Sequence, residues 1–198
     1  MGELNVIKNP DGIEGLRVIT PKVFGDERGY FLETFSERDL KEQAGIDVHF
    51  VQDNQSRSKQ GVLRGMHFQK QYPQAKLLRV TEGEVFDVAV DLRKGSATYG
   101  KVYSVVLSSD NFRQFFIPAG FAHGILVTSE YAILHYKCTD YYHPEDEGGL
   151  KWDDETVNIP WPLEKVGGRE KVVLSLKDKS NYTLQEIMKL QSEGKLNF

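Results

Sequence analysis

Short runs of β-branched and aromatic residues, separated by Gly, Pro, Asn and Asp, dominate the chain. Runs bounded in this way are typical of β-strands. We expect strands at residues 15–20, 29–35, 48–54, 75–81, 84–91, 99–107, 112–118 and 130–138. In the run at 84–91, Phe86 and Val88 share one face while Asp87 and Asp91 share the other, because side chains alternate along a strand. One face is therefore expected in the core, and the other can line a cavity.

Two segments have helical signals instead. Ser36 is followed three residues later by an aspartate, which predicts the start of a short charged helix ending near Gly45. Thr183 and Glu186 form a capping-box pattern ahead of apolar residues, which predicts a C-terminal helical extension at about 181–192. Both helices are expected at the periphery of the fold.

The chain carries no internal repeat, low-complexity stretch or linker-like segment. With 198 residues, of which 39% are hydrophobic, it is long enough to bury one sizeable core. We therefore expect a single domain over residues 1–198. Many short strands at close spacing indicate an all-β fold, and we predict a double-sheet jelly roll with short peripheral helices.

Charge and cysteine content limit the classes of partner and the cellular location that we expect. The net charge is −4, from 25 Lys and Arg against 29 Asp and Glu, so no overall basic field exists to hold nucleic acid. Cys138 is the single cysteine, which excludes an intrachain disulfide and suits a reducing cytoplasm. The apolar runs fall short of the roughly 18 residues that a membrane span needs. We expect no nucleic-acid or membrane partner and a cytoplasmic location.

A Pro-x-Gly-x-x-His turn lies at residues 117–124. Its proline fixes φ, its glycine permits a tight reversal, and His123 follows from the next strand. This turn resembles the second motif of the cupin superfamily. The alternative is that His123 is a buried histidine that satisfies a backbone carbonyl.

Further motifs occur in a fixed order, at 24–29, 61–69, 83–91, 136–142 and 174–178. Together they resemble the dTDP-4-dehydrorhamnose 3,5-epimerase family of the cupin superfamily, from about Val18 to about Asp178. The resemblance implies an isomerase with a cupin barrel and no metal or organic cofactor. It implies epimerisation of dTDP-4-dehydro-6-deoxy-D-glucose at C3 and C5 to dTDP-4-dehydro-L-rhamnose, in dTDP-rhamnose biosynthesis. It also implies a homodimer, because edge strands and termini in this family are exchanged between subunits.

Epimerisation beside a ketone needs a base, an acid on the opposite face and a positive group at the ketone oxygen. His67 is the expected base, because imidazole titrates near neutrality and a carboxylate can fix its tautomer. The resemblance assigns that carboxylate to Asp178, which by its own context could belong to a solvated turn. Tyr136 is the expected acid and Lys76 the expected cation at the enolate oxygen. The alternatives are a core aromatic for Tyr136 and a snorkelling surface lysine for Lys76.

Substrate capture needs groups that bind the diphosphate and the nucleotide base of the substrate. Arg28 and Arg64 can each bind phosphate oxygens bidentately, and the resemblance places both at the diphosphate. Arg28 could instead form a surface ion pair with a neighbouring carboxylate. The resemblance implies that Tyr142 stacks near the nucleotide base. It assigns other residues to the nucleotide and sugar, namely Glu33, Gln52, Asp53, Asn54, Lys76, His123, Glu147 and Lys177.

Three other functions stay open. A metal-dependent cupin would use His67 and His123, but Gln69 stands where a second histidine is needed, so the ligand set is incomplete. A non-catalytic sugar-binding cupin would not need an acid, a base and an oxyanion cation together. A 3-epimerase or a 3,4-ketoisomerase of a related nucleotide sugar is not separated by the sequence.

Overall fold

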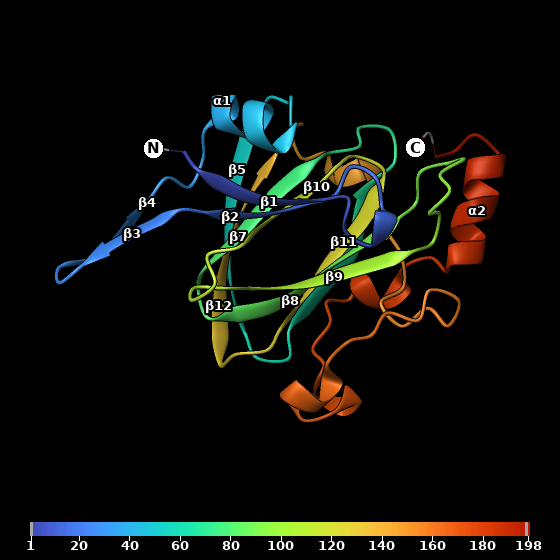
Figure 1. Cartoon of the computed structure of the whole chain (residues 1–198). Coiled ribbons are helices and arrows are strands. Elements are labelled where there is room, and N and C mark those ends of the chain that lie inside the picture. The colour runs from blue at the N-terminus through green and yellow to red at the C-terminus, as the bar shows by residue number, and fades with distance from the viewer. Residues whose placement is uncertain (1, 197) are drawn as a thin grey trace.

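Two antiparallel β-sheets pack face to face in the computed structural model, which describes residues 2–196 and 198 (Figure 1). The six-stranded sheet has, in spatial order, β1 (Leu4–Lys8), β2 (Arg17–Pro21), β10 (Gln114–Ile117), β7 (Lys76–Glu82), β12 (Tyr131–Cys138) and β5 (Gln52–Lys59). The five-stranded sheet has β13 (Glu147–Gly149), β6 (Leu63–Gln69), β11 (Phe121–Val127), β8 (Glu84–Asp91) and β9 (Val102–Ser108). The predicted all-β jelly roll of the cupin type is confirmed.

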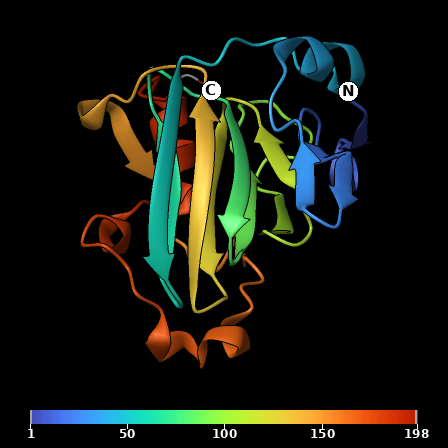
Figure 2. The same ribbon diagram turned by 90° about the vertical axis from the view of Figure 1, so that its left-hand side faces the viewer.

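A separate two-stranded hairpin stands away from both sheets. It consists of β3 (Val23–Asp26) and β4 (Gly29–Leu32), and it projects from the barrel on the side of the N-terminus (Figure 1). In Figure 2 it lies beside the six-stranded sheet, at the edge opposite β5. The hairpin exposes three aromatic side chains, Phe24, Tyr30 and Phe31, with 45%, 62% and 59% of their surface accessible. Such a patch on an isolated hairpin is unusual for a surface that stays in water.

Helices are short and lie outside the sheets, as predicted. Helix α1 (Glu37–Asp39) begins with Ser36 Oγ accepting the amide of Asp39, and it continues into the π-helical turn η2 (Leu40–Ala44). Gly45 ends this helix at φ 69°, a left-handed conformation that glycine adopts without strain. Helix α2 (Leu184–Ser192) has the predicted capping box. Single 3₁₀ turns are η1 (Pro10–Gly12), η3 (Pro144–Asp146), η4 (Leu163–Val166), η5 (Arg169–Lys171) and η6 (Asp178–Ser180).

Apolar residues fill one end of the space between the sheets. Phe115 and Leu78 of the six-stranded sheet meet Val85 and Ile125 of the five-stranded sheet there. A second cluster lies on the outer face of the five-stranded sheet, where residues 150–196 and 198 cover it. A third places η2 against the outer face of the six-stranded sheet. The other end of the space between the sheets is polar, and it forms the cavity described below.

Several strand predictions are confirmed, and others are wrong. The run at 84–91 matches β8 residue for residue, and the runs at 130–138 and 75–81 match β12 and β7 to within a residue. The run at 48–54 is wrong, because the strand begins at Gln52 and extends through a polar stretch to Lys59. Strands β1, β3, β6, β11 and β13 were not among the predicted runs. Among the described residues, no helix is long and apolar enough to cross a bilayer.

Candidate active site

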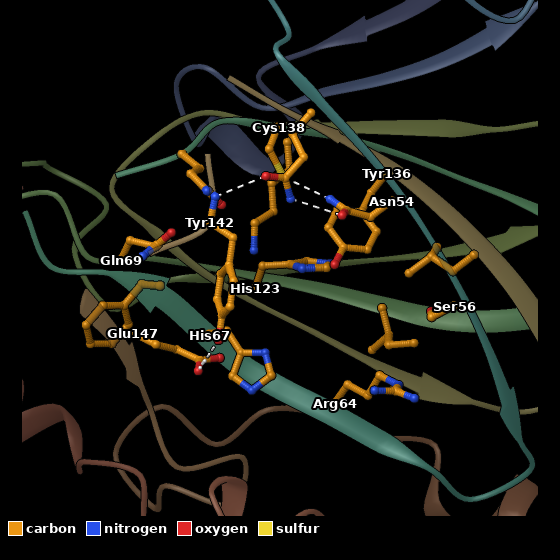
Figure 3. Close-up of a pocket in the computed structure, with 16 residues that line it drawn as sticks. Asn54, Ser56, Arg64, His67, Gln69, His123, Tyr136, Cys138, Tyr142 and Glu147 are labelled. Atoms are coloured by element: carbon orange, nitrogen blue, oxygen red, sulfur yellow. Dashed lines mark hydrogen bonds between the residues drawn. The ribbon is translucent and has the colours of Figure 1, made fainter. Parts of the chain in front are cut away.

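The polar end of the barrel encloses a cavity of about 330 Å³ between the two sheets. Strands β5, β7 and β12 supply one wall, β6 and β11 the other, and residues 142 and 147 stand at the mouth. Figure 3 shows His67, His123 and Tyr136 around a common space. The lining residues are Gln52, Asn54, Ser56, Arg64, His67, Phe68, Gln69, Gln74, Lys76, His123, Ile125, Leu134, Tyr136, Cys138, Tyr142 and Glu147.

A β-bulge in β6 brings two of these residues onto the same face. Arg64 and His67 are three positions apart and would face opposite sides of a regular strand. The register with β11 shifts between His123 and Ile125, which pair with His67 and Arg64, so two residues of β6 oppose Gly124 alone. Gly65 permits this, because a Cβ there would lie 2.5 Å from the Cα of Gly124.

His67 is bound to a buried carboxylate from the far end of the chain. Its Nε2 lies 2.5 Å from Oδ1 of Asp178, and Ser175 Oγ donates to Oδ2 of the same carboxylate at 2.8 Å. Burial favours the neutral acid, yet the hydrogen bonds from His67 and Ser175 hold the pKa of Asp178 below its usual value. An ionised Asp178 accepts a hydrogen bond from the Nε2–H group, which leaves His67 Nδ1 as the basic nitrogen of the ring.

Lys76 and Tyr136 face the same cavity from neighbouring strands. Lys76 on β7 pairs with Cys138 on β12, and Tyr136 lies two residues before Cys138. Within residues 2–196 and 198, neither the Lys76 ammonium nor the Tyr136 hydroxyl has a hydrogen-bond partner, so both are available to a ligand. Burial lowers the pKa of Lys76 and raises the pKa of Tyr136, and Tyr136 therefore carries its proton at neutral pH.

His123 is held by a carboxylate that the sequence analysis did not assign to the site. Its Nε2 lies 2.9 Å from Oδ1 of Asp87, whose side chain is completely buried. Burial raises the pKa of Asp87 and lowers that of His123. In the sequence, the alternation along β8 placed Asp87 on the face opposite the expected core face. No other feature of the sequence analysis pointed to Asp87.

Polar side chains surround the mouth of the cavity. Glu147 accepts a hydrogen bond from Tyr142 Oη at 3.0 Å and also binds the Lys177 ammonium. Gln52 donates to Asn54 at 3.0 Å, and the backbone amide of Tyr142 donates to Gln52 at 3.0 Å. All five belong to the set predicted around the nucleotide and sugar. Ser56, Gln69, Gln74 and Cys138 also line the cavity but were not assigned to the site from the sequence.

Four residues of the predicted substrate set do not line this cavity. Lys177 reaches only its mouth, through the contact with Glu147, and the other three lie farther away. Arg28 is 85% exposed at the tip of the β3–β4 hairpin, where it pairs with Asp26 at 2.5 Å. Glu33 follows the hairpin and does not reach the cavity. Asp53 alternates with Gln52 and Asn54 along β5, so it points out of the barrel and pairs with Lys137 at 2.8 Å. The surface ion pair considered for Arg28 is thus present.

Comparison with known proteins adds to this geometry. The sequence model of the dTDP-4-dehydrorhamnose 3,5-epimerase family matches residues 10–186. The chain belongs to this family. The enzyme of that name from Methanothermobacter thermautotrophicus is 52% identical over 94% of this chain and 97% of its own length, and the Escherichia coli enzyme is 48% identical over 95% and 98%. A crystal structure of the Legionella pneumophila 3,5-epimerase in complex with dTDP-4-keto-L-rhamnose is 50% identical and superposes with a TM-score of 0.86, over 92% of this chain and 94% of that one.

Each of the two cavity histidines is hydrogen-bonded to its own carboxylate. Asp178 binds His67 and Asp87 binds His123, so neither histidine shares a carboxylate with the other. In the part of the chain that the structure describes, no group of three His, Cys, Asp or Glu side chains is placed to hold a metal ion. The donor set therefore fits two separate hydrogen-bonded pairs better than a metal shell.

Proposed function

We propose that the protein epimerises dTDP-4-dehydro-6-deoxy-D-glucose at C3 and C5 to give dTDP-4-dehydro-L-rhamnose. One observation carries the proposal: a histidine paired with a carboxylate, a protonated phenol and a lysine all face a single cavity. C3 and C5 flank the C4 ketone, so one enolate-stabilising group serves both carbons. Relatives of about 50% identity carry the name of this reaction.

Each inversion consists of two proton transfers. His67 Nδ1 removes the hydrogen from C3 or C5, and the electron pair of that C–H bond moves into the ring to form an enolate whose charge is on O4. Lys76 stabilises this charge, and Tyr136 donates its proton to the opposite face of the same carbon. The imidazolium then loses its proton and the phenolate regains one from solvent, which readies the site for the second carbon.

The remaining cavity residues are proposed to bind the nucleotide. Arg64 lines the cavity with an exposed side chain and donates to Ser58 Oγ through Nε, which leaves its terminal nitrogens for phosphate oxygens. Tyr142 is half exposed at the mouth, where its ring can stack on the base. Gln52, Asn54, His123, Glu147 and Lys177 provide hydrogen-bonding groups for the sugars and the diphosphate.

We propose further that the protein works as a homodimer. Arg28 and Glu33 lie outside the cavity of their own chain, on or next to a hairpin that projects from the barrel. A second copy that covers Phe24, Tyr30 and Phe31 would bury this apolar patch. The same contact would bring Arg28 to the cavity of the partner, where a guanidinium can bind the diphosphate.

The product formed in deuterated water tests the function. The proposal predicts solvent deuterium at both C3 and C5 and a product of L-rhamno configuration, measured by NMR. A 3-epimerase would invert and label C3 alone, and a 3,4-ketoisomerase would move the keto group. A sugar-binding cupin would leave the substrate unlabelled, and any of these three results would refute the proposal.

A further inference from the structure

Asp87 is a buried carboxyl group that the proton transfers above do not use. It lies in the middle of β8, and its side chain has no accessible surface. Oδ1 receives the hydrogen bond from His123, whereas Oδ2 is buried without a hydrogen-bond partner among the described residues. A buried carboxylate oxygen without a partner is costly, so its retention calls for an electrostatic reason.

Lys76 provides such a reason from the opposite sheet. It projects from β7 into the space between the sheets, and it interacts electrostatically with Cys138 of β12, Asp87 of β8 and Glu147 of β13. Burial raises the pKa of the Cys138 thiol, so Cys138 carries no charge at neutral pH. Glu147 already binds the Lys177 ammonium. Asp87 is therefore the carboxylate near Lys76 that no other Lys or Arg neutralises within the described residues.

We propose that Asp87 is a positioning residue of the reaction, one oxygen holding the His123 ring and the other acting as counter-charge to the Lys76 ammonium at the floor of the cavity. This inference rests on the proposed function, because it concerns the charge that Lys76 presents to O4. It gives a role to Oδ2, which has no hydrogen-bond partner among the described residues, and Lys76 lines the same cavity as the His123 ring that Oδ1 holds. It also explains why a carboxylate, and not an amide, lies beneath His123.

The charge of Asp87 has a defined effect on pH dependence. Burial lowers the pKa of Lys76, and the negative charge of Asp87 opposes that shift. Without this charge the pKa of Lys76 falls further, so the ammonium is lost at a lower pH. The pKa of His123 falls as well, because Asp87 also opposes its desolvation, and His123 stays neutral. Only the loss of the Lys76 charge therefore affects turnover near neutral pH.

Asp87→Asn tests the charge alone, because an asparagine oxygen can still accept the hydrogen bond from His123. The alkaline limb of the kcat profile is expected to move to lower pH, with kcat reduced roughly tenfold or more on that limb and KM little changed. NMR of protein labelled with ¹³C at lysine Cε follows Lys76 directly, with Lys76→Met used to assign its resonance. The titration of that resonance is expected to move to lower pH in Asp87→Asn.

Asp91→Asn is the matched control. It removes a second buried carboxylate from the same strand, which binds Arg93 outside the cavity. Its kcat profile and Lys76 resonance are expected to match those of the wild type. A double-mutant cycle completes the test, because Asp87→Asn should have little further effect on turnover in a Lys76→Met background.

The outcomes separate this inference from the proposed function. A wild type without epimerase activity refutes the function, whereas an active wild type with an unmoved Lys76 titration in Asp87→Asn refutes the role of Asp87. Independent effects in the cycle also refute it. If Asp87→Asn does not fold, the wild-type protein is titrated instead. Its Lys76 resonance should show a second inflection at acid pH, where Asp87 takes up a proton. The same inflection should remain in Glu147→Gln, which removes the other nearby carboxylate. Absence of that inflection overturns the proposal.

Discussion

His67 and His123 are direct partners in the register of β6 and β11, yet the Nε2 atom of each ring is bound to a different carboxylate. A metal ion between the two rings would have to compete with both Asp178 and Asp87. Each histidine ring is thus held in place by its own carboxylate.

Metal removal is therefore expected to leave turnover unchanged. The proposed proton transfers use His67, Tyr136 and Lys76 only, so exhaustive dialysis against a chelator should alter kcat by less than the error of the assay. Elemental analysis of the active protein measures the remaining metal. Activity lost to the chelator and restored by Fe, Mn or Zn would support the metal-dependent alternative.

Replacement of His67 by asparagine should lower kcat by at least about 10²-fold, the lower range for loss of a general base. The variant should fold, because His67 is partly exposed to the cavity and packs little core. Circular dichroism and binding of dTDP serve as controls. Turnover close to that of the wild type would show that the base is another residue.

Tyr136→Phe should separate proton removal from inversion. The variant keeps His67 and Lys76, so hydrogen at C3 or C5 should still exchange with deuterated water while completed epimerisation falls sharply. NMR of the recovered substrate and product measures both rates. Full-rate formation of the doubly inverted product would make Tyr136 a wall residue.

A mixing experiment tests whether Arg28 serves the partner's cavity. Arg28→Ala and His67→Asn should each be nearly inactive alone. A heterodimer would have one cavity with both an intact His67 and an intact Arg28, so a fully exchanged equimolar mixture should regain about a quarter of wild-type activity. No recovery, or a monomer by light scattering, would contradict the exchanged hairpin.

Asp91 should contribute to stability in a defined pH range. Burial opposes its ionisation, but hydrogen bonds from Arg93, Thr98 and Ser96 lower the pKa of Asp91 from 3.8 to about 2. The folded pKa lies below the unfolded one, so the contribution is present above about pH 4 and is lost as the pH falls through about 2. Its size is about 2 kcal/mol. Urea denaturation from pH 7 to pH 2 should show Asp91→Asn less stable at neutral pH, with the two curves converging in acid.

Local patterns were sufficient to predict much of the fold. The strand at 84–91 and the capping box at Thr183 depend on residues close in sequence, and both are confirmed. The motifs also pointed to His67, Lys76 and Tyr136, which the structure places around one cavity.

Features that depend on pairing between distant strands could not be predicted from the sequence. The bulge in β6 exists because Gly65 packs on Gly124 of another strand, and it alone puts Arg64 on the same face as His67. Asp87 looks like any polar position of a half-exposed strand until the other sheet buries it. The family resemblance assigned Asp53 to the substrate, but side chains alternate along β5, and that of Asp53 points out of the barrel.

The hydrogen bond between His67 and Asp178 joins residues 111 positions apart in the chain. The carboxylate belongs to the C-terminal segment that covers the barrel, not to the barrel itself. Local opening of that segment would cost far less than unfolding the sheets. A barrel that has lost this cover would still look folded to most probes, yet His67, the proposed base, would have no partner to set its tautomer. Inactivation can therefore precede denaturation, and the lifetime of the enzyme at elevated temperature would be set by the attachment of its last fifty or so residues.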